Sequence, residues 1–289
     1  MAKAIEKKDK FHTDKSPTWC PGCGDFSIWM ALKEALEKLQ LEPEKVVIVY
    51  GIGCSGNMAN YVRTYGFHGL HGRALPVGEA VKMINPGMTV IVVGGDGDGL
   101  GEGIGHFLHS VRGNHDLTYI IHDNQVYGLT TGQTAPTSAK GFVTKSTPFG
   151  VLEEPVNAAA LALAAGGHFV ARGFAGEQMH LVDTLVRAIQ HPGFSLVDVL
   201  QPCVTFNDLN TYAWFFERIY KLEESEYAPN DRMQAMVKAM ESATLPIGVM
   251  YEGESTPYHL GVEGLDISKP LAEQKLKPRN ISTIVEHYL

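Results

Sequence analysis

Four short, continuously apolar runs constrain the fold of this chain more than any other feature of its sequence. They are rich in β-branched residues and are Val46–Tyr50, Thr89–Val93, Leu117–Ile121 and Phe194–Leu200. Stretches with helical spacing precede or separate them, namely Asp25–Leu39, Ile104–Val111, Ala158–Ala165 and Met179–Ile189. Apolar strands that alternate with helices are typical of a parallel sheet with helices on both faces, joined by right-handed crossovers. We therefore predict an α/β fold of that kind.

Each of these strands is followed closely by a residue that can carry chemistry. Cys54 follows the first run, Asp96 the second, Asn124 the third and Cys203 the fourth. In open parallel sheets, ligands bind beyond the carboxyl ends of the strands. The sequence therefore predicts that its reactive side chains gather along one edge of one sheet.

Composition and charge argue against several classes of function. The chain has 24 basic and 32 acidic residues, and its net charge of −8 disfavours binding to nucleic acid or to an anionic membrane surface. No apolar run approaches the roughly 20 residues that span a bilayer. Residues Met1–Lys15 lack the apolar core of a signal peptide. We therefore expect a cytoplasmic location, where cysteines stay reduced.

The chain is expected to have three parts. Residues 1–18 form a polar N-terminal arm, residues 19–210 form one cofactor-binding domain, and residues 211–289 form a C-terminal part that contacts another subunit. Within the last part, Trp214–Leu222 fits a helix. Residues 243–289 are rich in proline, glycine and charge, which favours an arm that packs on a neighbouring subunit.

The segment Gly95-Asp96-Gly97-Asp98 is the first candidate for a cofactor site. Glycines let backbone amides close on a phosphate, and Asp96 and Asn124 offer the oxygen ligands that Mg²⁺ prefers. The glycines of 95–105 do not have the spacing of a dinucleotide-binding motif, and the chain contains no G-K-[ST] phosphate loop. The alternative interpretation is a glycine-rich turn with an ordinary Asx turn, and composition alone leaves the two about even.

The cysteines are the second candidate for a site. Their number, four, is right for one tetrahedral site, and they are Cys20, Cys23, Cys54 and Cys203. Such a set suits zinc or a [4Fe–4S] cluster. Cys20 and Cys23 form a C-x-x-C motif, but the second motif of this kind that usually completes a zinc site is missing. Spacing alone leaves both groups open and slightly favours zinc.

Several motifs together resemble the β subunit of 2-oxoacid:ferredoxin oxidoreductases. In chain order they are Trp19–Gly24, Gly51–Ser55, His71–Arg73, Tyr127–Gln133 and Gln201–Cys203. In addition, Gly95–Gly97 with Asn124 resembles the metal-binding motif of thiamine diphosphate enzymes. The resemblance covers residues 17–205, and it implies a thiamine diphosphate-binding parallel-sheet fold with a C-terminal arm.

The resemblance also implies cofactors and roles for particular residues. Asp96, Asn124 and the carbonyl of Val126 would hold Mg²⁺, and the four cysteines would hold one [4Fe–4S] cluster. The residues implied to bind thiamine diphosphate are Ile52, Gly53, Cys54, Ser55, His71, Gly95, Asp96, Gly97, Asp98, Asn124, Gly128, Leu129 and Thr130. His71 would face the cofactor as a catalytic residue, although a lone histidine is more often structural. Arg73 and Thr131 are the candidates for substrate contacts, and some members of the family carry Lys in place of Thr131.

The function implied is oxidative decarboxylation of a 2-oxoacid with coenzyme A, in which electrons pass through the cluster to ferredoxin. We expect 2-oxoglutarate as the substrate, with pyruvate or a broad range of 2-oxoacids as the alternative, and the reaction could also run as reductive carboxylation. The glutamate that activates thiamine is expected from an α subunit, in an α2β2 assembly. Two other classes stay open: a non-redox thiamine diphosphate enzyme with structural zinc, and a zinc-stapled scaffold.

Overall fold

A computed structural model describes residues 9–274 and 281–289 of the chain. Residues 1–8 of the expected N-terminal arm and residues 275–280 of the expected C-terminal arm lie outside the described residues. Among the described residues, no helix has the length and apolar character needed to cross a membrane.

The centre of the molecule is an eight-stranded, mostly parallel sheet. Its strands are β1 (Val46–Tyr50), β2 (Tyr65–His68), β3 (Thr89–Gly95), β4 (Leu117–Asp123), β7 (Phe169–Phe174), β8 (Phe194–Leu200), β9 (Ile219–Lys221) and β10 (Leu245–Glu252). Their order across the sheet is β2-β1-β3-β4-β8-β7-β10-β9, and only the β7–β10 pair is antiparallel. A separate short hairpin joins β5 (Val126–Tyr127) to β6 (Gln133–Thr134). The predicted parallel sheet is therefore confirmed.

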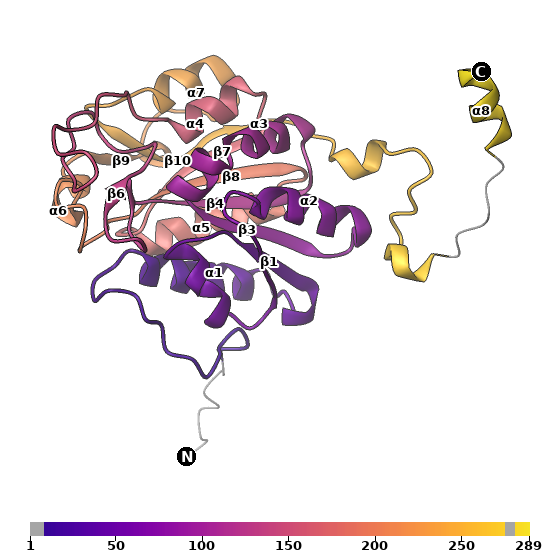
Figure 1. Cartoon of the computed structure of the whole chain (residues 1–289), viewed down its shortest axis with the longest axis horizontal. Coiled ribbons are helices and arrows are strands. Elements are labelled where there is room, and N and C mark those ends of the chain that lie inside the picture. The colour runs from indigo at the N-terminus through magenta and orange to yellow at the C-terminus, as the bar shows by residue number, and fades with distance from the viewer. Residues whose placement is uncertain (1–8, 275–280) are drawn as a thin grey trace.

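Helices cover both faces of this sheet, as the sequence predicts (Figure 1). The α-helices of the described residues are α1 (Asp25–Lys38), α2 (Ala74–Ile84), α3 (Ile104–Gly113), α4 (Ala158–Ala164), α5 (Gln178–Gln190), α6 (Tyr212–Phe216), α7 (Arg232–Ala239) and α8 (Ser282–Tyr288), of which α8 does not cover the sheet. On one face, α1 and α5 bury Leu32 and Leu185 in a core that includes Val197 of β8. On the other, α3 and α4 bury Phe107 and Leu163. Burial of side chains of this size stabilises each layer by about 1.5–3 kcal/mol per residue, before the cost of ordering the chain.

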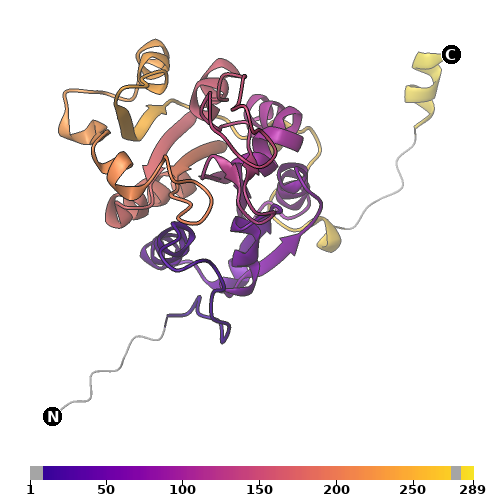
Figure 2. The same ribbon diagram turned by 60° about the vertical axis from the view of Figure 1, so that its left-hand side comes forward.

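The sheet extends further along the chain than the sequence predicts. β9 and β10 complete it, so the expected domain boundary at residue 210 does not coincide with its end. Residues 245–252 were expected in an arm but form a strand whose middle residues are buried. The expected helix at Trp214–Leu222 is also wrong in its bounds, because α6 ends at Phe216 and β9 follows. After Glu252 the chain leaves the sheet, and α8 lies apart from it in two views (Figures 1 and 2).

Candidate functional site

The carboxyl ends of four neighbouring strands meet at one edge of the sheet, and two adjoining cavities open there. Cys54 follows β1, Asp96 follows β3, Asn124 follows β4 and Cys203 follows β8. We call them the cofactor cavity and the cysteine cavity. The cofactor cavity is lined by Ile52–Ser55, His71, Gly95–Asp98, His122, Asn124 and Val126–Thr130. The cysteine cavity is lined by Thr18–Cys20, Cys23, Asp25, Cys54, Asn57, Asn124, Gly128, Leu129, Thr131, Gln201 and Cys203–Phe206.

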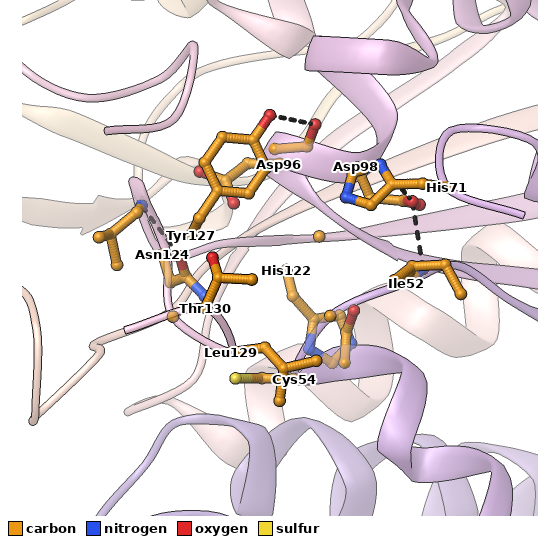
Figure 3. Close-up of a pocket in the computed structure, with 16 residues that line it drawn as sticks. Ile52, Cys54, His71, Asp96, Asp98, His122, Asn124, Tyr127, Leu129 and Thr130 are labelled. Atoms are coloured by element: carbon orange, nitrogen blue, oxygen red, sulfur yellow. Dashed lines mark hydrogen bonds and ion pairs between the residues drawn. The ribbon is translucent and has the colours of Figure 1, made fainter. Parts of the chain in front are cut away.

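The three predicted magnesium ligands all line the cofactor cavity. Asp96 and Asn124 are buried, and Val126 is 2% exposed. The Asp96 carboxylate accepts hydrogen bonds from the Thr137 hydroxyl and, at 2.9 Å, from the backbone amide of Gln125. The Asn124 side-chain oxygen accepts the amide of Val126 at 3.0 Å, which fixes the turn after β4. Figure 3 shows Asp96 and Asn124 on one side of the cavity, with Asp98 and His71 across from them.

The electrostatics of this side of the cavity fit a bound cation. Burial raises the pKa of Asp96 to about 7, even though the Thr137 hydroxyl and two backbone amides hydrogen-bond to its carboxylate. A buried carboxylate is costly unless it is paired or coordinates a metal. In addition, the Ser55 hydroxyl is buried beside the cavity without a hydrogen-bond partner in the described part of the chain. Oxygen ligands of this kind fit Mg²⁺ shared with phosphate groups.

The loop after β3 forms a short π-helix, Gly97–Glu102, and its glycines allow close packing against two tyrosines. A Cβ atom at Gly97 would lie 2.3 Å from the ring of Tyr127, and one at Gly99 would lie 1.8 Å from the hydroxyl of Tyr119. The Tyr127 hydroxyl donates to the carbonyl of Gly97 at 3.0 Å, which holds the ring over this loop. The loop therefore needs glycine for packing as well as for access to a phosphate.

Asp98 ties neighbouring loops together. Its carboxylate accepts the amide of Gly72 at 2.7 Å and the amide of Ile52 at 3.1 Å. Burial raises its pKa, and the two amides and the His71 imidazole oppose that rise. Because Oδ1 accepts both amides, Asp98 acts as a clamp between the loop after β1 and the segment that leads into α2.

His71 lies at the cofactor cavity, as predicted, but the two candidate substrate residues do not. The Nδ1 atom of His71 is 3.0 Å from the carboxylate of Glu102 and 3.4 Å from that of Asp98. Arg73 is exposed, and its guanidinium donates to the carbonyl of Glu102 at 3.1 Å. Thr131 is exposed and lines the cysteine cavity instead.

All four cysteines line the cysteine cavity, and none forms a disulfide. Three loops meet there, because the amide of Gly24 donates to the carbonyl of Pro202 at 3.2 Å and the Trp19 indole donates to the carbonyl of Cys54 at 2.8 Å. A Cβ atom at Gly128 would lie 3.4 Å from the sulfur of Cys54 and 3.7 Å from that of Cys203. Gly128 therefore belongs to the wall between the two cavities and lies next to the sulfurs of Cys54 and Cys203.

The chemistry of these thiols fits ligation of a positively charged group. Burial raises the pKa of Cys54 to about 12 and also raises the pKa values of Cys23 and Cys203, and the nearby carboxylate of Asp25 adds to each shift. Such thiols stay protonated at neutral pH unless a metal draws off the proton. Within residues 9–274 and 281–289, no three His, Cys, Asp or Glu side chains converge closely enough to hold one ion. What the four cysteines share is one cavity, which all of them line.

Several residues at the two cavities were not assigned a role from the sequence, and four of them stand out. Asp25 and Gln201 line the cysteine cavity, and His122 and Tyr127 line the cofactor cavity. Gln201 donates to the sulfur of Cys23 at 3.3 Å. The signal that could have found them is their position, since each lies within two residues of a predicted ligand in the sequence.

Comparisons with known proteins indicate the family of the chain. Residues 51–199 match the family model described as thiamine pyrophosphate enzyme, C-terminal TPP binding domain, and residues 203–266 match the family model for the C terminal of the pyruvate ferredoxin oxidoreductase beta subunit. The chain is 46% identical over 249 residues to the 2-oxoacid:ferredoxin oxidoreductase subunit beta of Saccharolobus solfataricus, covering 82% of each chain. It is 43% identical over 203 residues to the 2-oxoglutarate oxidoreductase subunit KorB of Mycobacterium tuberculosis, covering 70% of this chain and 54% of that one.

A solved structure is also similar in fold. It is the 2-oxoglutarate:ferredoxin oxidoreductase from Magnetococcus marinus with 2-oxoglutarate, coenzyme A and succinyl-CoA bound. The match has a TM-score of 0.85 and 34% sequence identity, and it covers 89% of each chain.

Proposed function

Because the chain belongs to the family of 2-oxoacid:ferredoxin oxidoreductase β subunits, we propose that it binds thiamine diphosphate, Mg²⁺ and one [4Fe–4S] cluster. Together with an α subunit it oxidatively decarboxylates a 2-oxoacid, with coenzyme A as acyl acceptor and ferredoxin as electron acceptor. The observation that carries this proposal is the shared wall between the two cavities. Cys54, Asn124, Gly128 and Leu129 line both of them.

The cofactor cavity would hold the magnesium diphosphate end of thiamine diphosphate at Asp96, Asn124 and the carbonyl of Val126. Thiamine diphosphate, when bound, supplies the electron sink that lets a 2-oxoacid lose CO₂. The chain's own contribution is to fix these oxygens through Thr137 and the turn after β4. Gly97 lets the loop approach closely, and the Asp98 clamp keeps Ile52 and its neighbours against the cavity.

The cysteine cavity would hold a [4Fe–4S] cluster on Cys20, Cys23, Cys54 and Cys203. Such a cluster, when bound, supplies one-electron transfer. One observation favours it over structural zinc. The cysteine cavity shares a wall with the cofactor cavity, where an electron carrier would accept electrons from the cofactor and a redox-inactive zinc ion would not.

The preferred substrate is 2-oxoglutarate, and pyruvate or a broad 2-oxoacid range is the alternative. The names of the M. tuberculosis relative and the M. marinus structure support the first choice. A second carboxylate in a closed pocket needs a cation or hydrogen-bond donors. Arg73 and Thr131 do not line the cofactor cavity. We therefore propose that they contact the substrate only if their side chains move or if a partner subunit completes the pocket.

We expect an α partner because the relatives of this chain are β subunits of a larger enzyme, and this chain is not assigned the glutamate that activates thiamine. Thiamine chemistry in this family needs one, and the α subunit would supply it in an α2β2 assembly located in the cytoplasm. The part of the chain after Glu252, which leaves the sheet, is the arm proposed to contact another subunit.

The test is coexpression with the α subunit under anaerobic conditions, followed by steady-state assays with coenzyme A and ferredoxin. We expect turnover that depends on thiamine diphosphate, with a higher kcat/KM for 2-oxoglutarate than for pyruvate. Asp96→Asn should abolish it, while Asp183→Asn, on α5 in an exposed ion pair with Lys38, should not. The opposite substrate order would correct the substrate alone, whereas turnover without thiamine diphosphate would contradict the proposal.

A further inference from the structure

Two buried residues outside the predicted ligand sets connect the two cavities. Asp25 is the first residue of α1 and is two residues after Cys23, and His122 lies in β4 two residues before Asn124. Their side chains are 0% and 1% exposed, and Oδ1 of Asp25 lies 2.6 Å from Nδ1 of His122. They are far apart in the sequence, so only the fold brings them together.

Asp25 faces the cysteine cavity with its other oxygen. Its Oδ2 accepts from the thiol of Cys23 at 3.4 Å, and the residue lines the cavity. The Asp25 carboxylate also acts on two further thiols. Burial raises the pKa values of Cys54 and Cys203, and the nearby negative charge of Asp25 raises them further. A buried carboxylate at this place keeps negative charge beside whatever the four cysteines hold.

His122 lines the cofactor cavity instead of the cysteine cavity. Figure 3 shows its ring on the same side as Cys54 and Leu129. A carboxylate can only accept, so Nδ1 of His122 carries the hydrogen that goes to Asp25. The remaining ring atom, Nε2, is buried and has no hydrogen-bond partner in the described part of the chain. A buried polar atom without a partner, on a residue that lines a cavity, indicates a contact with the occupant of that cavity.

We propose that Asp25 is a positioning residue for both cavities: it holds His122 so that Nε2 contacts the bound thiamine diphosphate, and its carboxylate lies against the cysteine-bound cluster. This inference rests on the proposed function. It has the consequence that the two sites are coupled energetically. Occupation of the cofactor cavity changes the reduction potential of the cluster, and reduction of the cluster changes the affinity for thiamine diphosphate by the same factor.

The test is a redox titration of the cluster followed by electron paramagnetic resonance, on the anaerobic complex with and without thiamine diphosphate and Mg²⁺. The variants are Asp25→Asn, which keeps the shape but removes the charge, and His122→Phe, which keeps the ring but removes both nitrogens. His122→Gln is the second variant at that site. The matched control is Asp183→Asn, at an exposed residue of α5 whose carboxylate pairs with Lys38 and which lines neither cavity.

In the wild type and in Asp183→Asn, we expect the reduction potential of the cluster to shift when thiamine diphosphate is added. In His122→Phe this shift in reduction potential should disappear. In Asp25→Asn the potential without thiamine diphosphate should be higher than in the wild type, and the shift should be smaller. His122→Gln should keep part of the shift. An unchanged shift in His122→Phe, or none in the wild type, overturns the coupling. Wild-type protein that holds no cluster or binds no thiamine diphosphate would instead overturn the proposed function on which the inference rests.

Discussion

Gly97 is the position at which a single methyl group tests the geometry of the cofactor cavity most sharply. In Gly97→Ala the new Cβ would lie 2.3, 2.7 and 2.8 Å from three ring atoms of Tyr127. The ring cannot move away freely, because its hydroxyl is hydrogen-bonded to the carbonyl of Gly97 and lies 3.3 Å from the carboxylate of Glu102. Overpacking of this kind costs about 1–3 kcal/mol.

The displaced ring has the cofactor cavity beside it, since Tyr127 lines that cavity. We therefore expect Gly97→Ala to lower both the free energy of unfolding, measured in urea, and the affinity for thiamine diphosphate, measured by calorimetry. Gly105→Ala is the matched control, because no atom lies within 4 Å of a Cβ built there. It lies in α3, where alanine is favoured over glycine by roughly 0.5–1 kcal/mol.

A second variant separates packing from any other effect of the new methyl group. Adding Tyr127→Ala to Gly97→Ala removes the ring that the methyl group meets, so the two changes should be less costly together than the sum of their separate costs. If Gly97→Ala were as stable as Gly105→Ala and bound thiamine diphosphate equally well, the close approach of Tyr127 to this loop would be refuted.

Three further changes test separate parts of the account. Cys203→Ser should lose iron, measured by elemental analysis, together with activity, and a variant that kept both would remove Cys203 from the ligand set. Asp96→Ala should lose thiamine diphosphate binding in calorimetry but keep its brown colour, because the cysteines are untouched; wild-type affinity would reduce Gly95–Asp98 to a plain turn. Glu223 has a lowered pKa, since its hydrogen bond to His180 and further hydrogen bonds outweigh burial, which alone would raise it. The stabilisation from ionised Glu223 is therefore present above the pKa of the unfolded state, and it is lost as the pH falls through the pKa of the folded state. Glu223→Gln should consequently flatten the acid side of a plot of Tm against pH. An unchanged plot would contradict this.

The strands that the sequence predicted are those whose residues are buried on both faces of the sheet. Val46–Tyr50 and Phe194–Leu200 have the predicted bounds, because continuous β-branched and aliphatic runs have no other stable place in an α/β fold. The strand Phe169–Phe174 was missed because Arg172 and Gly173 interrupt its apolar run. In the fold, Arg172 is buried beside the carboxylate of Asp198 at 3.4 Å, a partner that the local sequence does not reveal.

β10 was missed for a related reason. Pro246 and Gly248 are typical of loops, and Gly248 has a φ of 114° that places its backbone against the carboxylate of Glu223. Tertiary contacts decide this strand, because β10 lies between β7 and β9 in the sheet and its middle residues are buried. The secondary-structure propensity of the local sequence does not indicate those neighbouring strands.

The candidate site was predictable where a rule of topology applied to it. The carboxyl ends of β1, β3, β4 and β8 meet, so Cys54, Asp96, Asn124 and Cys203 gather as expected. The pair formed by Asp25 and His122 followed no such rule, because a histidine inside a strand is usually structural. Arg73 and Thr131 were chosen by position in a motif, and side-chain direction, which a motif does not fix, separates them from the cofactor cavity.

The central claim is that four cysteines of this chain hold an iron–sulfur cluster beside a thiamine diphosphate site. The most direct measurement is the metal and sulfide content of the protein purified anaerobically with its α subunit, together with its visible spectrum. The account predicts brown protein with iron and acid-labile sulfide in equal amounts, bleached when 2-oxoglutarate and coenzyme A are added. Colourless protein that contains zinc in place of iron would contradict it.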